Sequence, residues 1–295
     1  MTRTPIVGSC TLWPLLLAAS IAAQDPLPRI AYDEKDSVAK IEIHLKDFHD
    51  STRVSDQLKP CFQESDYCVI GTASFLNDEG DVLTAAHVAR DAAAVSQTLR
   101  DLGIDSELMV AGHARNAEYV KAGVSSGGGA FRASLKTIDS EHDLAVLQPD
   151  RNQAIPTVDA SRRRQRLTVQ LANQRPTAGD AVFAFGFAPY SPALITAVGS
   201  ITLAVGSQNL IEARKSGDTQ LVPVYRAGLN ISPSNSGGPL FRSSDGALLG
   251  IVSEIKDTKE NIEIIIPATE IAKVLSANAI KWTVAPPPAR KHRRL

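Results

Sequence analysis

The chain has 295 residues, 43% of them hydrophobic and 21% charged, and its 31 Lys and Arg residues stand against 32 Asp and Glu residues. This composition is that of an ordinary folded protein and excludes a disordered or collagen-like chain. The near-zero net charge also argues against a protein that holds nucleic acid by bulk charge.

The N-terminal residues 1–23 have the pattern of a secretory signal peptide. Arg3 is followed by an apolar run, and small residues ending at Ala23 offer a cleavage site. A membrane anchor is the alternative interpretation. Pro14 interrupts the run, however, and leaves it shorter than the roughly 20 apolar residues that a membrane span needs. We therefore expect cleavage and export, with residues 24–36 as an N-terminal extension.

Cysteine usage fits an oxidising compartment. Cys10 lies within the signal peptide, which leaves Cys61 and Cys68 as an even pair. A disulfide between them would close a loop of about eight residues and contribute about 2.5 kcal/mol in the chain-entropy model. A zinc site is not expected, because the two thiols lack further Cys or His partners at suitable spacing.

Short strand signals dominate the rest of the chain. The candidate strands are Ser37–Leu45, Val69–Leu76, Val82–Thr84, Leu144–Leu147, Ala181–Phe187, Ile195–Val205, Leu221–Tyr225, Ala247–Ile255 and Ile262–Ile266. The second and third flank a turn at Asn77–Gly80, which predicts a hairpin. Helical signals are few: Asp91–Leu102 could form a short helix, and Thr269–Ala277 another, with Thr269 as N-cap. Many short strands with a terminal helix favour an all-β barrel or sandwich.

Three polar stretches have plain interpretations. Ser125–Gly129 is glycine-rich, but no Gly-Lys-Ser/Thr follows it, so a hairpin tip is favoured over a phosphate loop. Arg162–Arg166 indicates a solvated linker between lobes, with a polyanion contact as the alternative. Residues 281–295 form a Pro-rich basic tail, either solvated or a weak tether to an acidic surface. Without Arg3 and the four basic residues of the tail tip, 26 basic residues face 32 acidic ones, a net charge of −6.

Three motifs carry the chemistry. They are Thr84–Val88 (TAAHV), His142–Leu147 (HDLAVL) and Asn235–Leu240 (NSGGPL), which present a histidine, an aspartate and a serine in that order. A serine hydroxyl becomes a nucleophile when an imidazole accepts its proton, and a carboxylate holds that imidazole in the right tautomer. Glycines after the serine permit a tight turn at the substrate.

These strings match the histidine, aspartate and serine motifs of the trypsin-like serine peptidases. The chain resembles that family, and most closely its bacterial HtrA-type branch. Three flanking stretches agree: Gly71–Phe75 resembles the family's GSGF stretch, Ala178–Phe183 with the following Gly186 its GD-V strand, and Gly250–Ser253 the strand that lines the substrate cleft.

The resemblance implies an all-β fold of two six-stranded antiparallel β-barrels (chymotrypsin-like), with the active site in the interlobe cleft and a short C-terminal helix. It covers residues 37–280, with lobe one at about 37–150 and lobe two at about 165–280. HtrA-type proteins often carry PDZ modules after this domain. We expect none here, because too few residues follow residue 280.

The resemblance also assigns roles to residues. His87 is the general base and acid, Asp143 orients it, and Ser236 is the nucleophile. The backbone N–H groups of Ser234 and Ser236 form the oxyanion hole. Ser253, on the cleft-lining strand, supports the buried Asp143.

Neighbouring residues of the same types are not expected to take part. His142 adjoins Asp143, but consecutive strand residues point to opposite faces. Asp139 and Glu141 lack the apolar strand that follows Asp143 directly.

Two positions bear on competence and specificity. The family normally has glycine where Ser234 stands, two residues before the nucleophile, and losing one oxyanion donor costs about 10²–10³ in rate. Asn230, six residues before Ser236, resembles the base of the primary substrate pocket. Because Asn230 is uncharged, we expect small or medium apolar side chains there rather than Arg or Lys.

The sequence thus predicts a secreted or periplasmic serine endopeptidase that acts through an acyl-enzyme on unfolded protein or exposed loops. No metal or organic cofactor, no nucleic acid and no stable membrane span is implied. Ser234 keeps two alternatives open: a catalytically weak or inactive relative that binds peptides, and an exported scaffold or adaptor.

Overall fold

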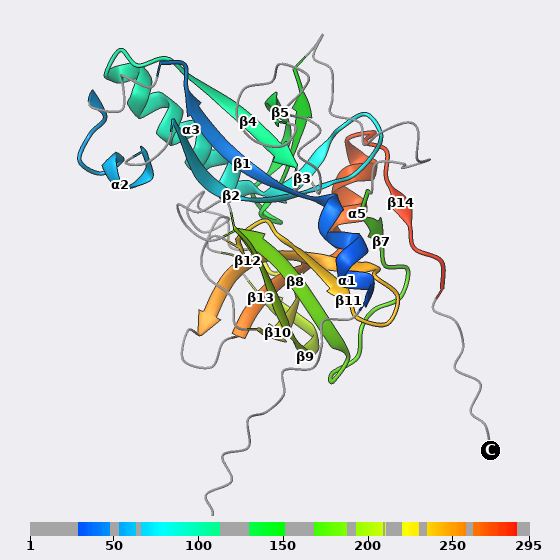
Figure 1. Cartoon of the computed structure of the whole chain (residues 1–295). Helices are drawn as coiled ribbons and strands as arrows, with labels where there is room; N and C mark the ends of the chain where they lie inside the picture. The colour runs from blue at the N-terminus through cyan, green and yellow to red at the C-terminus, as the bar shows by residue number, and fades with distance from the viewer. Residues whose placement is uncertain are drawn as a thin grey trace, which may run out of the picture.

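The computed structural model describes residues 29–47, 53–62, 66–112, 130–150, 168–187, 193–208, 210, 220–229, 235–257 and 262–287. These residues form two β-barrels, one above the other in Figure 1, as the resemblance implies. The stretches Ser125–Gly129 and Arg162–Arg166 lie outside the described residues, as do the signal peptide and the tip of the tail.

Lobe one is a closed antiparallel barrel with the strand order β1-β2-β3-β6-β5-β4. Its strands are β1 (Val38–Leu45), β2 (Tyr67–Phe75), β3 (Val82–Ala85), β4 (Ser106–Gly112), β5 (Ala130–Asp139) and β6 (Leu144–Pro149). The predicted hairpin is confirmed, with Phe75 of β2 paired to Val82 of β3. Helix α2 (Lys59–Phe62) precedes β2, and helix α3 (Ala86–Asp101) follows β3 directly.

Lobe two is a second barrel, formed when β11 pairs with both β8 and β12. Its six strands are β8 (Ala181–Phe187), β9 (Leu194–Gln208), β10 (Val222–Gly228), β11 (Pro239–Arg242), β12 (Leu248–Asp257) and β13 (Ile262–Pro267). Two short strands, β7 (Gln170–Leu171) and β14 (Thr283–Val284), extend the sheet in parallel beside β12. Helix α5 (Ala268–Ala277) follows β13.

Several sequence predictions need correction. Strands β4, β5 and β11 were not among the expected strands, because charged or glycine-flanked residues weaken their alternation. Helix α3 begins at Ala86, five residues before the expected start, so His87 lies in its first turn. Thr269 is not the N-cap of α5: Pro267 holds that position, without a side-chain cap hydrogen bond.

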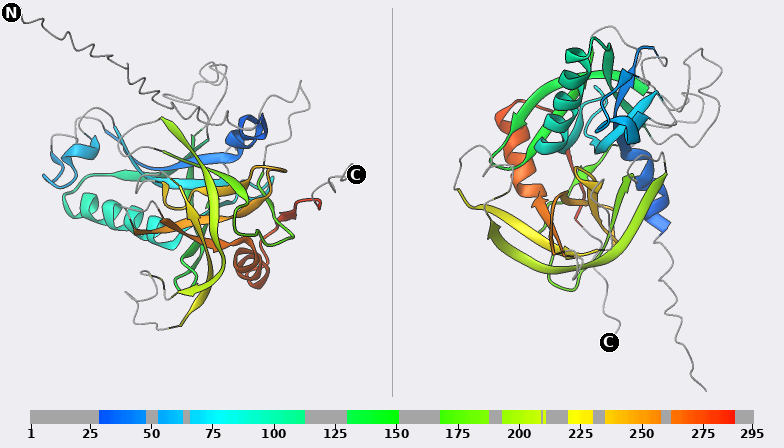
Figure 2. Two further views of the ribbon diagram at one scale, coloured as in Figure 1. Left: turned by 90° about the horizontal axis from the view of Figure 1, so that it is seen from below. Right: turned by 90° about the vertical axis from the view of Figure 1, so that its left-hand side faces the viewer.

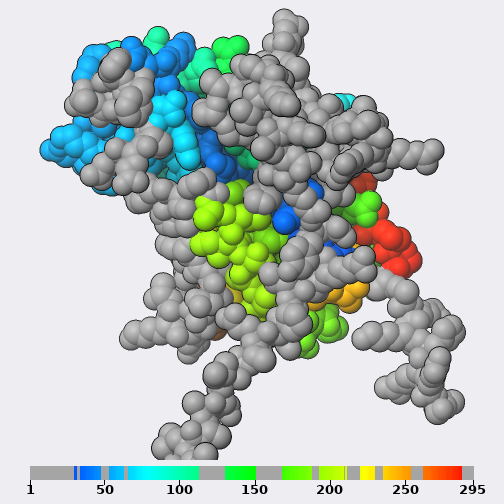
Figure 3. Space-filling model, in the orientation of Figure 1, coloured from blue at the N-terminus to red at the C-terminus, as the bar shows by residue number. Residues whose placement is uncertain are grey.

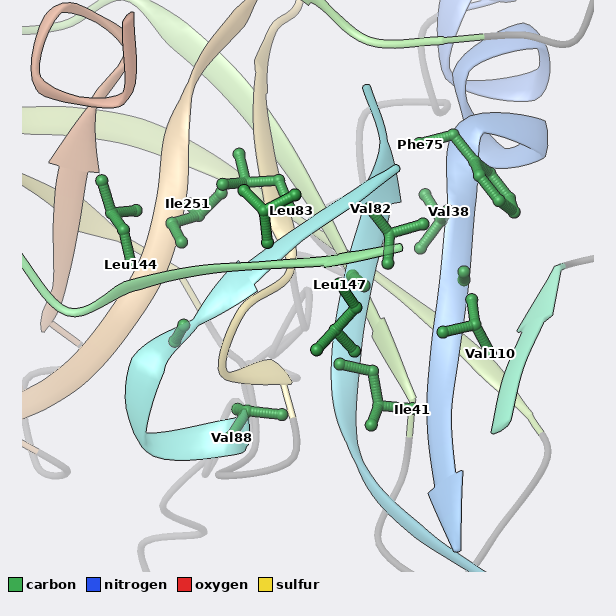
Figure 4. Close-up of a cluster of buried hydrophobic side chains, with 14 of the residues drawn as sticks. Val38, Ile41, Phe75, Val82, Leu83, Val88, Val110, Leu144, Leu147 and Ile251 are labelled. Carbon is green, nitrogen blue, oxygen red and sulfur yellow. The ribbon is translucent and has the colours of Figure 1, made fainter. Parts of the chain in front are cut away.

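Two buried clusters explain why both barrels form. The larger cluster fills lobe one and continues into the interface between the lobes, where Ile251 of β12 lies beside Leu83 and Leu144 (Figure 4). The smaller cluster takes residues from all six strands of lobe two, as a barrel interior does. Strand β8 serves both, because its alternating residues face opposite sides: Phe183 belongs to the larger cluster and Val182 to the smaller.

Both ends of the described chain pack across the lobes. Helix α1 (Arg29–Glu34) and the 3-10 turn η1 (Lys35–Ser37) lead into β1 of lobe one. Yet a Cβ on Gly246, in the β11–β12 turn of lobe two, would lie 2.9 Å from the Ile30 side chain of α1. Figures 1 and 2 show α1 and α5 as helices outside the barrels, and in Figure 3 the blue and cyan lobe lies above the yellow-green one.

A disulfide joins Cys61 of α2 to Cys68 of β2, as the even cysteine pair suggested. The two Cα atoms are 5.0 Å apart, within the usual range for such a bridge. Within the described ranges, no helix combines the length and apolar character that a bilayer crossing requires.

Candidate active site

The end of one strand and the start of another bring His87 and Asp143 together. Ala85 at the end of β3 pairs with Leu144 at the start of β6, so the residues just beyond these ends meet. The backbone N–H of Ala86 donates to the carbonyl oxygen of Asp143 at 3.1 Å. His87 then contacts the Asp143 carboxylate twice: its backbone N–H donates to Oδ1 at 3.0 Å, and its Nδ1 lies 2.9 Å from Oδ2.

Asp143 is only 1% exposed and adopts a positive φ of 51°, a conformation that aspartate tolerates better than most residues. A buried carboxylate is costly unless hydrogen-bond donors surround it. Ser253 of β12 supplies a third donor, with its Oγ 2.5 Å from Oδ2 of Asp143. The carboxylate is therefore fixed from both lobes.

A β-bulge in β12 directs the side chain of Ser253 toward Asp143. Along β12, Val252 pairs with Ile265 and Glu254 pairs with Ile264, so Ser253 is the extra residue between two successive pairs. Bulges of this kind redirect a side chain next to a functional site.

The turn that carries Ser236 is hydrogen-bonded to one strand of each lobe. The backbone N–H of Thr72 in β2 donates to the carbonyl oxygen of Ser236 at 3.1 Å. The N–H of Gly237 donates to the carbonyl oxygen of Val252 at 2.8 Å, one residue before Ser253. Ser236 is thereby brought to the place where β2, β3 and β12 converge.

Gly237 permits the closest of these approaches. Its φ is 78°, and a Cβ there would lie 2.9 Å from the backbone nitrogen of Ala85 and overlap Thr84 Oγ1. Ala85 precedes His87 by two residues. The turn after Ser236 thus rests against the segment that leads into His87, as a nucleophile and its base require.

Thr72 and Thr84 organise this junction, and sequence reasoning did not single them out. The Thr84 hydroxyl donates to the carbonyl oxygen of Thr72 at 2.8 Å, and the Thr72 hydroxyl accepts the N–H of Phe187 at 3.2 Å. Both threonines are fully buried. Their place within the Gly71–Phe75 and Thr84–Val88 motifs was the available signal.

The other predicted residues fall into two groups. Ser253, expected both to support Asp143 and to line the cleft, is hydrogen-bonded to Asp143. Asn230 and Ser234 lie outside the described residues.

His142 does not contact Asp143 through its side chain. It lies in a turn rather than on a strand, so the strand argument against it was wrong, but its Nδ1 is 3.0 Å from Oδ2 of Asp139. This hydrogen bond raises the pKa of His142 above its ordinary value. Among the described residues, no group of three His, Cys, Asp or Glu side chains could hold a metal ion.

Comparison with known proteins agrees with this geometry. A family model described as "Trypsin-like peptidase domain" matches residues 71–251, more than half of the chain. The chain therefore belongs to the trypsin-like peptidase family and is a serine endopeptidase by class. No curated protein matches the chain.

Solved structures share the fold at low sequence identity. The HtrA-type protease AlgW, determined with a decapeptide, is 22% identical with a TM-score of 0.54, and the match covers 84% of this chain and 67% of AlgW. The active form of the Rv3671c protease from M. tuberculosis is 18% identical with a TM-score of 0.55, covering 97% of this chain and 95% of that one. The HtrA-type neighbour agrees with the branch that the motifs suggested.

Proposed function

We propose that this chain is an exported serine endopeptidase in which Ser236 is the nucleophile, His87 the general base and acid, and Asp143 the residue that orients His87. The observation that carries the proposal is the contact of His87 Nδ1 with the buried Asp143 carboxylate, 2.9 Å from Oδ2. With Nδ1–H donating to Asp143, Nε2 is the unprotonated nitrogen and can accept a proton.

The reaction follows from these positions. Ser236 Oγ attacks the scissile carbonyl carbon while His87 Nε2 takes the hydroxyl proton, and the carbonyl oxygen becomes an oxyanion. The intermediate collapses, the C–N bond breaks, and His87 returns the proton to the departing amine. A water molecule, deprotonated by His87, then hydrolyses the ester on Ser236 and releases the second product.

The oxyanion is to be stabilised by the backbone N–H groups of Ser236 and Ser234. Gly237 and Gly238 support this role, because they hold the turn with hydrogen bonds from Gly237 N–H to Val252 and from Gly238 N–H to Asn235, both 2.8 Å long. A fixed turn keeps its N–H groups oriented before the charge develops.

Export is supported by residues 1–23, which have the signal-peptide pattern, and by the Cys61–Cys68 disulfide, a bond typical of oxidising compartments. Unfolded polypeptides or exposed loops are the proposed substrates. The decapeptide bound in the AlgW structure supports this choice by analogy of fold.

The test is labelling with a fluorophosphonate, which reacts only with an activated serine. The full chain is produced with its leader, purified after export, and compared with Ser236→Ala and His87→Ala. We expect labelling at Ser236 that falls by at least about 10³-fold in either variant. His142→Ala is the matched control, because His142 contacts Asp139 instead of Asp143, and it should label at the parent rate.

An unlabelled but folded protein would instead favour a peptide-binding relative without catalysis. The sequence feature that supports this second candidate is Ser234, where the family has glycine. A Ser234→Gly variant that gains labelling would locate the defect in the oxyanion hole.

A further inference from the structure

Thr72 of β2 makes hydrogen bonds through each of its three polar groups. Its backbone N–H donates to the carbonyl oxygen of Ser236 at 3.1 Å, and its carbonyl oxygen accepts the Thr84 hydroxyl at 2.8 Å. Its own hydroxyl oxygen accepts the backbone N–H of Phe187, at the end of β8, at 3.2 Å. This fully buried side chain therefore lies where the segments that carry Ser236 and His87 meet lobe two.

The contact with Thr84 connects β2 to the segment that leads into His87. Backbone pairing between β2 and β3 ends at Ser74 and Leu83. Beyond that pair, the Thr84 hydroxyl continues the connection through its hydrogen bond to the Thr72 carbonyl oxygen. Thr84 precedes His87 by three residues, and α3 begins between them. This contact therefore helps to fix where His87 lies relative to β2.

The turn after Ser236 packs on the same hydrogen bond. A Cβ on Gly237 would overlap both of its oxygen atoms, the Thr84 Oγ1 and the carbonyl oxygen of Thr72. A Cβ on Gly238 would lie 3.3 Å from the Thr72 methyl carbon Cγ2. The spacing between this turn and β3 is therefore set by the atoms of these two threonines.

The hydroxyl of Thr72 extends this junction into lobe two. Strands β2 and β8 meet where the lobes adjoin (Figure 1), and there the Thr72 hydroxyl accepts the Phe187 N–H. Phe187 directly follows Gly186 in β8. Gly186 packs closely against Asn235, the residue before Ser236. The strand end that Thr72 contacts is thus the one on which the turn with Ser236 rests.

We propose that Thr72 is a positioning residue for the reaction: its hydroxyl and backbone fix the turn that carries Ser236 at the distance from His87 that proton transfer requires. The inference rests on the proposed catalytic role of Ser236. A serine and its base must approach within about 2.6–3.2 Å, and a misplacement of about 1 Å can cost about 100-fold in rate. Thr72 acts through the turn and through Thr84 rather than through the substrate, so its loss lowers kcat and leaves KM unchanged.

The test compares Thr72→Val with Thr72→Ser. Valine keeps the methyl group that packs on Gly238 and removes the acceptor for the Phe187 N–H, whereas serine keeps that acceptor. Fluorescently labelled casein, an unfolded polypeptide, is the substrate with which kcat and KM are measured. We expect kcat to fall by at least about 10-fold in Thr72→Val with KM within about twofold, and Thr72→Ser to recover most of kcat.

Ser74→Ala is the matched control. Ser74 is also fully buried on β2, two residues after Thr72 and on the same face of the strand. Its hydroxyl has no hydrogen-bond partner in the part of the chain that the structure describes, so its loss should leave kcat within about threefold. If Thr72→Val does not fold, Thr84→Val, which removes the donor to the Thr72 carbonyl oxygen, must show the same fall in kcat.

Fluorophosphonate labelling of Ser236 in the same samples separates the role of Thr72 from the proposed catalysis. A parent that labels, with a kcat that Thr72→Val leaves unchanged or that Thr72→Ser does not recover, overturns the role of Thr72 alone. A change in KM without a change in kcat overturns that role too. A folded parent that does not label overturns the proposed catalysis and this inference with it.

Discussion

Asp143 shows how hydrogen bonds stabilise a buried carboxylate in this fold. Its carboxylate contacts the backbone N–H and Nδ1 of His87 from lobe one and the Ser253 hydroxyl from lobe two. These contacts offset the loss of water around a side chain that is 1% exposed. They also fix the direction in which His87 presents its second nitrogen, so orientation and stability depend on the same atoms.

Ser253→Ala removes one of these contacts and separates the two roles predicted for Ser253. A serine that positions Asp143 affects kcat, whereas one that only binds substrate affects KM. We expect kcat to fall about 10-fold with KM within twofold, because a hydrogen bond to a charged group contributes about 1.5–3 kcal/mol. Steady-state kinetics on a peptide substrate measure both constants. Ser253→Thr, which keeps the hydroxyl, should recover most of kcat, and a change in KM alone would refute the positioning role.

Glu263 should make stability fall as the pH rises. Its pKa is raised by burial from 4.5 to about 7, so between these values the folded state holds a proton that the unfolded state has released. Desolvation is the sole cause of the shift. Glu263 lies on β13, and the neighbouring strand β10 contributes one titratable group, Tyr225, to the smaller buried cluster, which fills lobe two.

Glu263→Gln removes that proton linkage. Thermal unfolding should show the variant gaining stability over the parent between pH 5 and pH 8, by about 2–3 kcal/mol, because each unit of raised pKa corresponds to about 1.4 kcal/mol. Glu270→Gln is the comparison variant, because Glu270 is also buried, at 3% exposed, but pairs with Lys273. An equal difference from the parent at pH 5 and pH 8 would show that Glu263 keeps its ordinary pKa.

Sequence alone predicts the motif residues and leaves the burial of Glu263 unseen. His87, Asp143 and Ser236 lie in sequence motifs whose chemistry can be inferred without coordinates. In the sequence, Glu263 is one acidic residue in an apolar strand. The alternation of apolar and polar residues does not distinguish an acid that faces solvent from one inside a barrel. The position of Glu263 inside the barrel depends on its strand partners Ala227 and Ile255, which lie 36 and 8 residues before it in the chain.

At the scale of elements, strand β8 supports the turn that carries Ser236. Gly186 faces Asn235, which is fully buried and directly precedes Ser236. A Cβ on Gly186 would overlap the Asn235 side chain and lie 2.8 Å from its Cα atom. Strand and turn can pack this closely only because position 186 has no side chain.

Gly186→Ala should therefore displace the turn. We expect a destabilisation of about 1–3 kcal/mol, as for other overpacked cores, and a loss of fluorophosphonate labelling of at least about 10-fold, because Ser236 moves with Asn235. Denaturant unfolding and labelling rates measure the two effects. Gly112→Ala is the control, since a Cβ there would make an ordinary 3.6 Å contact with Phe75. A variant as stable and as reactive as the parent would contradict this packing.

Elements with strong periodicity were predicted well and irregular ones were not. Strand β8 has the predicted bounds, Ala181–Phe187, because seven apolar residues bounded by turn residues admit few other structures. The start of α3 was missed because no capping side chain marks it, and Ala85 serves as N-cap without a side-chain hydrogen bond. The bulge at Ser253 depends on the pairing of β12 with β13, which no local pattern encodes.

At the scale of the molecule, the C-terminal segment fastens one lobe to the other. Asn77, in the β2–β3 turn of lobe one, donates from Nδ2 to the carbonyl oxygen of Lys281 at 3.0 Å, across 204 residues. The same amide donates to Asp81 at 2.9 Å, and its oxygen accepts the N–H of Glu79 at 3.0 Å. Lys281 also pairs with Glu79. The turn and the segment after α5 thus form one hydrogen-bonded unit.

Asn77→Ala should loosen this unit. Losing the Asn77 amide removes its hydrogen bonds to Asp81, Lys281 and Glu79, and we expect a destabilisation of about 2–3 kcal/mol. Trp282, the only tryptophan after residue 23, reports on the segment through its fluorescence in a guanidinium titration. Asn77→Asp keeps the acceptor for the turn but loses the donor to Lys281, and it places a second carboxylate beside Asp81. A Trp282 transition at the parent midpoint in both variants would show that the contact adds nothing to stability.

The most direct test of the account is to trap the acyl-enzyme. The exported protein is mixed with an activated ester, quenched in acid within the first turnover, and analysed by intact mass and peptide mapping. We predict one acyl group per chain, located on Ser236, and none in Ser236→Ala. Turnover of the ester without an adduct on Ser236, or with the adduct on another residue, would contradict the proposed mechanism.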